Sequence, residues 1–97
     1  MTVRTMFNAT TWLAAIHRDD RLWDRQRDVA SYIASRADRH GKLRTSVVHI
    51  ARYCGCTSGE ARRVLRSLRL LGWAMTTTNG MIVDVVATMS LSAMRRA

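Results

Sequence analysis

The chain has 97 residues, of which 47% are hydrophobic and 24% charged, a composition that indicates one small globular domain and excludes a disordered, collagen-like or disulfide-stapled chain. Sixteen basic residues against seven acidic ones give a net charge of +9, which favours a polyanionic partner, nucleic acid before an anionic membrane surface. Neither a signal peptide nor a membrane span is expected, and the two closely spaced cysteines are typical of a reduced, cytoplasmic protein.

Two helices are predicted in the first part of the chain. A helix over residues 8–18 begins with Asn8, whose side chain can accept a hydrogen bond from a free amide of the first turn. The adjacent Asp19 and Asp20 interrupt the apolar pattern and are expected to cap a second helix over about residues 21–39. The apolar positions of this second helix recur at helical spacing and are Leu22, Val29, Ala30, Ile33 and Ala37.

Two more helices are predicted on either side of a tight turn at Cys54-Gly55-Cys56. Gly41 suits the left-handed position after the end of the second helix. The third helix covers about residues 46–53. The fourth covers about residues 57–71. It opens with Thr57-Ser58-Gly59-Glu60, which has the spacing of a capping box, with a hydroxyl and a carboxylate that satisfy two free amides.

A β-hairpin is predicted after the fourth helix, with strands over about residues 73–78 and 81–87. The Asn79-Gly80 pair between them favours a type I′ turn, because both residues tolerate positive φ. Apolar residues occupy both faces, with Trp73, Ile82 and Val86 on one and Met81, Val83 and Val85 on the other. Only one face can meet the core, so the other needs the N-terminal segment, the tail or a second copy, which favours a homodimer.

The excess positive charge is concentrated in the second half of the chain. Residues 17–40 carry six arginines and five aspartates, whereas residues 41–73 carry seven basic residues and Glu60 as the single acid. On the fourth helix an apolar stripe is centred near Ala61 and Leu68. Almost opposite this stripe lie Gly59, Arg62, Arg63 and Arg66, with Arg69 at one side. An ordinary solvated face mixes acids with bases, so this face favours nucleic-acid binding.

The segment from Val47 to Val64 resembles a helix-turn-helix unit. Ile50 and Ala51 stand where the two helices of such a unit touch, and Gly55 stands in its turn. The Leu-Gly-Trp run at 71–73 and the hairpin resemble the wing that follows. About residues 12–87 are therefore similar to winged helix-turn-helix domains of phage and plasmid replication initiators and of small regulators of GC-rich bacteria.

This resemblance implies an α+β fold, mainly α with a small β-hairpin. It implies four helices followed by a two-stranded wing in a single domain over residues 1–97. The helix-turn-helix core is expected at about 46–71 and the wing at about 73–87. The tip of the wing, residues 77–81, carries no charge, so a phosphate-gripping wing is not expected.

The resemblance and the basic face together predict binding of double-stranded DNA, with the fourth helix in the major groove, where arginine can donate two hydrogen bonds to guanine. The predicted DNA-binding residues are Arg44, Ser46, Arg52, Thr57, Ser58, Gly59, Arg62, Arg63, Arg66 and Arg69. The expected role is sequence-specific transcriptional regulation. The alternative is a phage or mobile-element accessory protein of replication or excision.

Other functional classes have weaker signals. Leu70 on the basic face leaves open a protein-interaction module without DNA binding. His49, Cys54 and Cys56 are better explained as a surface histidine and small buried cysteines than as metal ligands, so no metal is expected. The Asp19-Asp20 pair lacks the partners of a nuclease site, and no catalytic motif is present. The sequence therefore predicts no enzyme, no cofactor, no membrane partner and no small-molecule ligand. Its tryptophans, Trp12, Trp23 and Trp73, are expected in the core or an interface.

Overall fold

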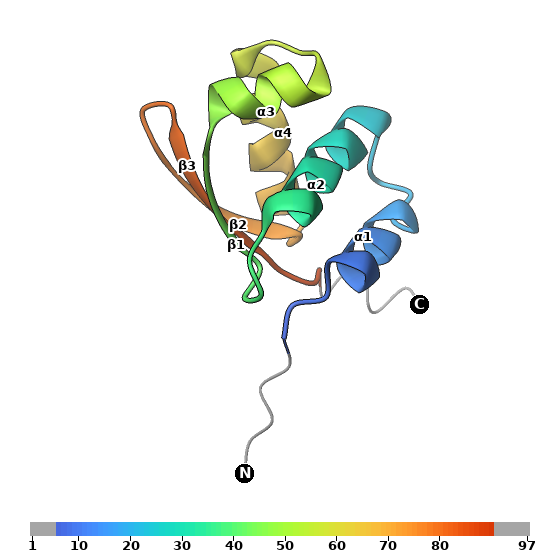
Figure 1. Ribbon diagram of the computed structural model, residues 1–97. Coiled ribbons are helices and arrows are strands. Elements are labelled where there is room, and N and C mark those ends of the chain that lie inside the picture. The colour runs from blue at the N-terminus through green and yellow to red at the C-terminus, as the bar shows by residue number, and fades with distance from the viewer. Residues whose placement is uncertain (1–5, 91–97) are drawn as a thin grey trace.

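The computed structural model describes residues 6–90 and has four helices and three strands there. In chain order they are α1 (Ala9–His17), α2 (Asp24–Arg36), β1 (Lys42–Ser46), α3 (Val47–Cys54), α4 (Ser58–Leu70), β2 (Ala74–Asn79) and β3 (Ile82–Ala87). The strands form one antiparallel sheet in the order β1–β3–β2, and the β2–β3 hairpin projects beside the helices (Figure 1). The expected α+β class is confirmed. Residues 1–5 and 91–97 of the predicted domain lie outside the described residues.

The sheet contains a strand that was not expected from the sequence. The expectation of only two strands is wrong, because β1 pairs with the Ile82–Val86 stretch of β3. Leu43 and Thr45 of β1 are more buried than their neighbours, which is the period-two alternation of a strand. Across this ladder Arg44 faces Asp84, 40 residues away in the sequence. Turn signals predict pairing only between strands that follow each other closely in the sequence, so they cannot predict this pairing.

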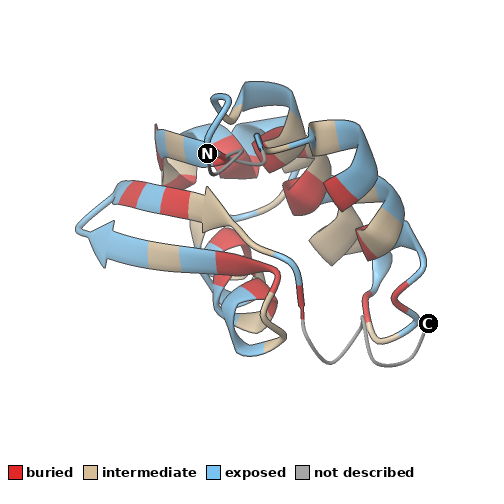
Figure 2. Ribbon diagram, turned by 90° about the horizontal axis from the view of Figure 1, so that it is seen from below, coloured by how far each residue is buried: buried red, intermediate tan, exposed pale blue. Residues whose placement is uncertain are grey.

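The two faces of the hairpin have different environments. Val83 and Val85 of β3 are completely buried, whereas Ile82 on the opposite face is 46% exposed. The expected grouping of Trp73 with Ile82 is wrong, because Trp73 precedes β2 and is fully buried in the core. Figure 2 shows buried and exposed residues alternating along β3, while the tip of the hairpin is exposed. One sheet face therefore closes the core, and the other is surface.

The turn of the hairpin differs from the expected type. Asn79 is the last residue of β2 and pairs with Ile82, so the two loop residues are Gly80 and Met81. Gly80 has a φ of 63°, and none of the non-glycine residues among 6–90 has a positive φ. A positive φ at the first loop residue alone is the pattern of a type II′ turn, which also suits the twist of a hairpin. The hairpin is confirmed, but its type I′ assignment is wrong.

Caps explain where the first two helices begin. Asn8 caps α1 as expected, because its Oδ1 accepts a 3.0 Å hydrogen bond from the amide of Thr11. Asp19 and Asp20 do not cap α2. That helix begins at Asp24, and the amide of Trp23 before it donates to Oε1 of Gln26 at 2.5 Å. The gap between the helices is therefore longer than expected.

The second helix is also shorter than expected at its other end. It stops at Arg36, and Ala37 has an extended backbone. Gly41 has a positive φ of 75°, but it lies in the turn that enters β1 and not at the helix end. In that turn the carboxylate of Asp38 accepts hydrogen bonds from the amides of Lys42 and His40, which lower the pKa of Asp38.

Asp19 has a structural role that the sequence did not indicate. Its carboxylate is buried and receives two hydrogen bonds from the guanidinium of Arg21, at 2.8 and 2.6 Å. It also accepts a 2.8 Å hydrogen bond from the indole nitrogen of Trp73. The hydrogen bonds from Arg21 hold the pKa of Asp19 well below its ordinary value, and the bond from Trp73 contributes to this shift. The α1–α2 connection is thereby fixed to the start of β2.

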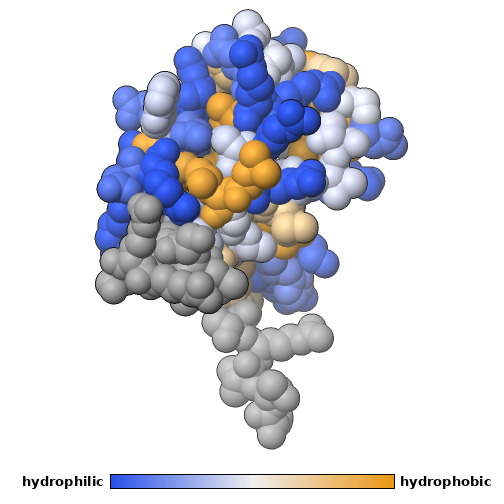
Figure 3. Space-filling view, turned by 180° about the vertical axis from the view of Figure 1, so that it is seen from behind, coloured by the Kyte–Doolittle hydropathy of each residue, from blue (hydrophilic) through white to orange (hydrophobic). Residues whose placement is uncertain are grey.

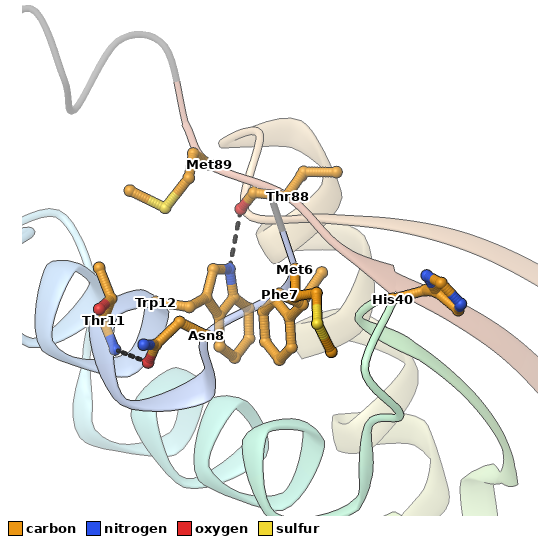
Figure 4. A pocket seen from close by; sticks show the side chains of 9 residues that line it. Met6, Phe7, Asn8, Thr11, Trp12, His40, Thr88 and Met89 are labelled. Carbon is orange, nitrogen blue, oxygen red and sulfur yellow. Dashed lines mark hydrogen bonds between the residues drawn. The ribbon is translucent and has the colours of Figure 1, made fainter. Parts of the chain in front are cut away.

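Two of the three tryptophans belong to the core, and the third does not. Trp12 and Trp73 are 2% and 0% exposed. The indole nitrogen of Trp12 donates to the carbonyl oxygens of Thr88 and Trp73, at 2.8 and 3.2 Å (Figure 4). Trp23, in contrast, is 79% exposed, so of the two expected locations, core or interface, the core is wrong for this residue. Helix α1 is thus held against the C-terminal end of the described chain.

Candidate nucleic-acid interface

The turn between α3 and α4 has the backbone expected from the sequence. Gly55 has φ 65° and ψ 40°, the left-handed conformation that a Cβ atom would strain. The amide of Cys56 donates to the carbonyl oxygen of Ala51, which closes the turn. Thr57 then caps α4, because its hydroxyl oxygen accepts a 3.1 Å hydrogen bond from the amide of Glu60. The order helix, tight turn, capped helix is therefore present.

Helix α4 has one buried side and one basic side. Ala61, Leu65 and Leu68 face the core and are at most 4% exposed. Every arginine of the helix is exposed, and these residues are Arg62, Arg63, Arg66 and Arg69. Within residues 6–90, the side chains of Arg63, Arg66 and Arg69 have no hydrogen-bond or ion-pair partner. Their guanidinium donors are therefore available to an external anion.

Arg62 differs from the other three arginines. Its Nη2 donates to the carbonyl oxygen of Gly80 at 2.9 Å and lies 3.1 Å from the sulfur of Met81. The side chain therefore bridges α4 and the tip of the hairpin. The sequence predicted a DNA contact at this position and gave no sign of the bridge, which joins residues that are 18 apart.

A groove separates α4 from β2. Its volume is about 560 Å³, and its lining residues are Gly59, Arg62, Arg63, Leu65, Arg66, Arg69, Leu70, Thr76 and Thr78. The threonines were not predicted as site residues, because only the pairing of β2 with β3 turns them toward α4. Guanidinium groups on one wall and hydroxyls on the other are the donors that phosphate oxygens accept. Figure 3 shows the back of the molecule, where hydrophilic residues surround a smaller hydrophobic area.

The start of α4 presents small polar residues beside this groove. Thr57 precedes the helix, Ser58 opens it, and Gly59 is exposed with ordinary space around its Cα. The free amides at a helix N-terminus carry partial positive charge. These three predicted residues therefore lie on the element that carries the arginines, at its positive end.

Three of the predicted residues do not join this group. Arg44 lies on the outer face of β1 and pairs with Asp84 through hydrogen bonds of 2.8 and 3.2 Å. This pairing raises the pKa of Arg44 and lowers that of Asp84. Ser46 caps α3 by accepting from the amide of His49. Arg52 is exposed on α3 and lines a different depression. Arg44 is therefore a sheet residue whose charge is paired, and it lies apart from the arginines of α4.

The cysteines of the turn are free thiols of intermediate exposure. Burial raises the pKa of the Cys54 thiol to about 11, and the neighbouring Cys56 adds to the effect. Over residues 6–90, no group of three or more His, Cys, Asp or Glu side chains is placed to hold a metal ion. Another depression lies near the start of α1, but the indole nitrogen of Trp12 within it already donates to Thr88 (Figure 4).

No family model, curated protein or solved structure matches this chain at a significant level. Among residues 6–90 no helix is long and apolar enough to cross a membrane.

Proposed function

We propose that this protein binds double-stranded DNA as a winged helix-turn-helix, with α4 in the major groove and the β2–β3 hairpin as the wing. The observation that carries the proposal is the set of unpartnered arginines on α4, opposite its buried side. Two further observations support the proposal. The turn before α4 is tight and left-handed. In chain order, a strand precedes the α3–α4 helix pair and a hairpin follows it. The additional strand β1 fits this arrangement, because it pairs with β3 at the base of the hairpin.

The residues on α4 divide by the kind of contact that each can make. A helix fits the major groove, and an arginine can donate two hydrogen bonds to the O6 and N7 atoms of guanine. Arg63 lies almost opposite the buried residues, so it is best placed to reach bases. Arg66 and Arg69 lie further along α4, where the helix leaves the DNA major groove in this arrangement, and are best placed to hold the phosphate backbone. In this arrangement the wing contacts the phosphate backbone with the hydroxyls of Thr76 and Thr78 rather than with charged side chains.

The proposed biological role is transcriptional regulation by a small protein that occupies its site. A winged helix that occupies its site acts by blocking, bending or recruiting at the bound sequence. An accessory role in the replication or excision of a phage or mobile element uses the same DNA-binding geometry and remains the alternative. Identification of the bound sequence from a random pool distinguishes them by where that sequence occurs in the genome.

A protein-interaction role is the second candidate, and one observation favours it. Leu70 is 77% exposed and lies on the groove wall among the arginines. On the outer face of the sheet, Met75 and Ile82 are also exposed, which keeps the predicted homodimer a reasonable proposal. Sedimentation equilibrium over a range of protein concentrations tests for the dimer.

The test of DNA binding is the salt dependence of affinity for duplex DNA. Each neutralised phosphate contributes about −0.9 to the slope of log K against log salt concentration, so four contacts predict a slope of about −3.6 per protomer. Fluorescence anisotropy with random and selected duplexes measures this slope. Absence of binding at low salt, or a slope near zero, would reject the DNA proposal and leave the protein-interaction role.

A further inference from the structure

A second basic surface lies between α2 and α3. We call it the α2–α3 furrow, and its lining residues are Tyr32, Arg36, His49, Arg52 and Tyr53. A neighbouring depression shares Tyr32, Arg36 and His49 and continues the furrow toward β1. The furrow and the α4–β2 groove share no lining residue. In Figure 1 α4 lies behind α3, and the arginines of α4 are on the side opposite its buried residues, which pack on the core shared with α2 and α3.

Arg36 is held in place within the furrow by aromatic rings. Its guanidinium carbon lies 4.3 Å from the centre of the Tyr32 ring and 5.3 Å from that of Tyr53. The two rings pack edge to face at 5.2 Å, and the hydroxyl of Tyr32 lies 2.6 Å from the Oγ1 of Thr45. Because stacking fixes the guanidinium without using most of its N–H groups, it can bind an anion with little loss of side-chain entropy.

The rest of the furrow is also suited to an anion. Arg52 and His49 are exposed on α3 and extend the row of donors beside Arg36. Among residues 6–90 that line the furrow and its continuation, none is acidic. Arg44 at the far end has its charge satisfied by Asp84, so the available charge is concentrated around Arg36 and Arg52.

We infer that the α2–α3 furrow binds the phosphate backbone of a second DNA duplex, so that one molecule bridges two duplex segments. The inference rests on the proposed function for the first duplex, which α4 holds. A duplex is stiff over about 150 base pairs, so a short duplex lying along α4 cannot also reach a surface on another side of a small protein. Single strands are disfavoured because they require successive exposed aromatic rings, whereas here Tyr32 is buried and only Tyr53 is exposed.

The experiment is a capture assay with the full chain. A biotinylated short duplex on beads is saturated with protein, and retention of a second, fluorescent duplex is measured over a range of salt concentrations. We expect capture by the wild-type protein. Arg36→Ala combined with Arg52→Ala should lower capture at least tenfold and make its salt slope shallower by about two, since two phosphate contacts are lost. Affinity for a single duplex in solution is measured for each variant as the reference, and the loss of capture should exceed any loss of that affinity at least fivefold.

Control variants separate charge, folding and dimerisation. Arg18→Ala combined with Arg39→Ala removes the same charge from exposed positions outside the furrow and should capture like the wild type. Arg52→Glu reverses an exposed charge that has no partner among the described residues, so it should lose capture with an unchanged melting temperature.

The outcomes that reject the inference are distinct from failure of the proposed function. Capture that survives both furrow variants means that bridging comes from two α4 helices in a dimer, and the furrow proposal is wrong. Preferential capture of a labelled single strand also rejects it. A protein that binds one duplex but never a second contradicts bridging alone, whereas a protein that binds no duplex contradicts both proposals.

Discussion

The guanidinium of Arg62 donates a 2.9 Å hydrogen bond to the carbonyl oxygen of Gly80, so the exposed side of α4 is tied to the tip of the hairpin. The contact also brings Nη2 to 3.1 Å from the sulfur of Met81. An arginine that holds two elements together is less available to DNA than its neighbours. The contact joins α4 to the tip of the hairpin whose strand β2 forms the other wall of the groove, which the other arginines also line.

The first prediction concerns this bridge. Arg62→Ala should release the hairpin tip and raise amide exchange in the Thr78–Ile82 stretch, with a stability loss of about 0.5–1 kcal/mol, because the bond is exposed. Arg63→Ala removes the same charge from a side chain without a described partner and should leave hairpin exchange unchanged. Hydrogen exchange followed by NMR compares them. Equal exchange in both variants would show that the bridge does not restrain the hairpin.

The second prediction separates Arg63 from Arg69. Arg63 lies almost opposite the buried side of α4, so Arg63→Ala should cost about 1–3 kcal/mol on the best site and relax preference at one base position. Arg69 lies six residues later and to one side, toward the end of α4, where the helix leaves the DNA major groove in the proposed arrangement. Arg69→Ala should weaken binding to all sequences about equally and make the salt slope shallower by about one.

Affinities for the best site and for point-substituted sites, at two salt concentrations, test both assignments. If Arg63→Ala lowers the affinity for all of these sites equally, Arg63 does not read a base. If Arg69→Ala changes the preference among DNA sequences, α4 enters the DNA major groove at another angle.

Local signals in the sequence predicted the four helices and the turn between α3 and α4, but not the two ends of α2, and long-range contacts explain what they missed. Gly55 and Thr57 act within a few residues, so their roles could be inferred from spacing alone. Strand β1 depends on a partner that is far along the chain, and nothing near Lys42 indicates it. The same holds for the candidate site. The arginines of α4 follow from helical periodicity, whereas the facing threonines of β2 follow only from tertiary packing.

Asp19 shows how a residue type can mislead. An aspartate before a helix usually caps it, yet here the carboxylate turns inward to Arg21 and the indole of Trp73. The inward orientation of this carboxylate depends on the position of Trp73, which lies 54 residues later and cannot be predicted from a local pattern. Similarly, the bulk of Trp23 suggests burial, but its place before the first turn of α2 leaves it at the surface.

The third prediction is a pH dependence of stability. The pKa of Asp19 is lowered in the folded protein, so its stabilising contribution is complete above its ordinary value of 3.8 and is lost as the pH falls below that value. Asp19→Asn should cost about 1.5–3 kcal/mol near neutral pH, because it removes charged hydrogen bonds to a buried group. The difference in melting temperature between Asp19→Asn and the wild type should shrink on acidification. A difference that stays constant down to about pH 2 would contradict the assignment.

The fourth prediction concerns the turn before α4. The φ of Gly55 is 65°, and open space surrounds the position of a Cβ atom there, so strain comes from the backbone alone. Gly55→Val should lower stability by about 1–2 kcal/mol. Gly55→Asn is the matched control and should cost less, since asparagine tolerates the left-handed region. Thermal unfolding measures both. Equal melting temperatures for Val and Asn would mean that the turn relaxes to another backbone conformation.

The raised pKa of Cys54 has a consequence for redox chemistry. A thiol with a pKa of about 11 is protonated almost completely near neutral pH, and only about one molecule in ten thousand carries the thiolate that attacks disulfides, peroxides or alkylating agents. The helix pair that carries α4 therefore has an inert thiol at the end of α3. Alkylation or oxidation at Cys54 should therefore be slow near neutral pH, so that this position at the end of α3 keeps its thiol under mild oxidants.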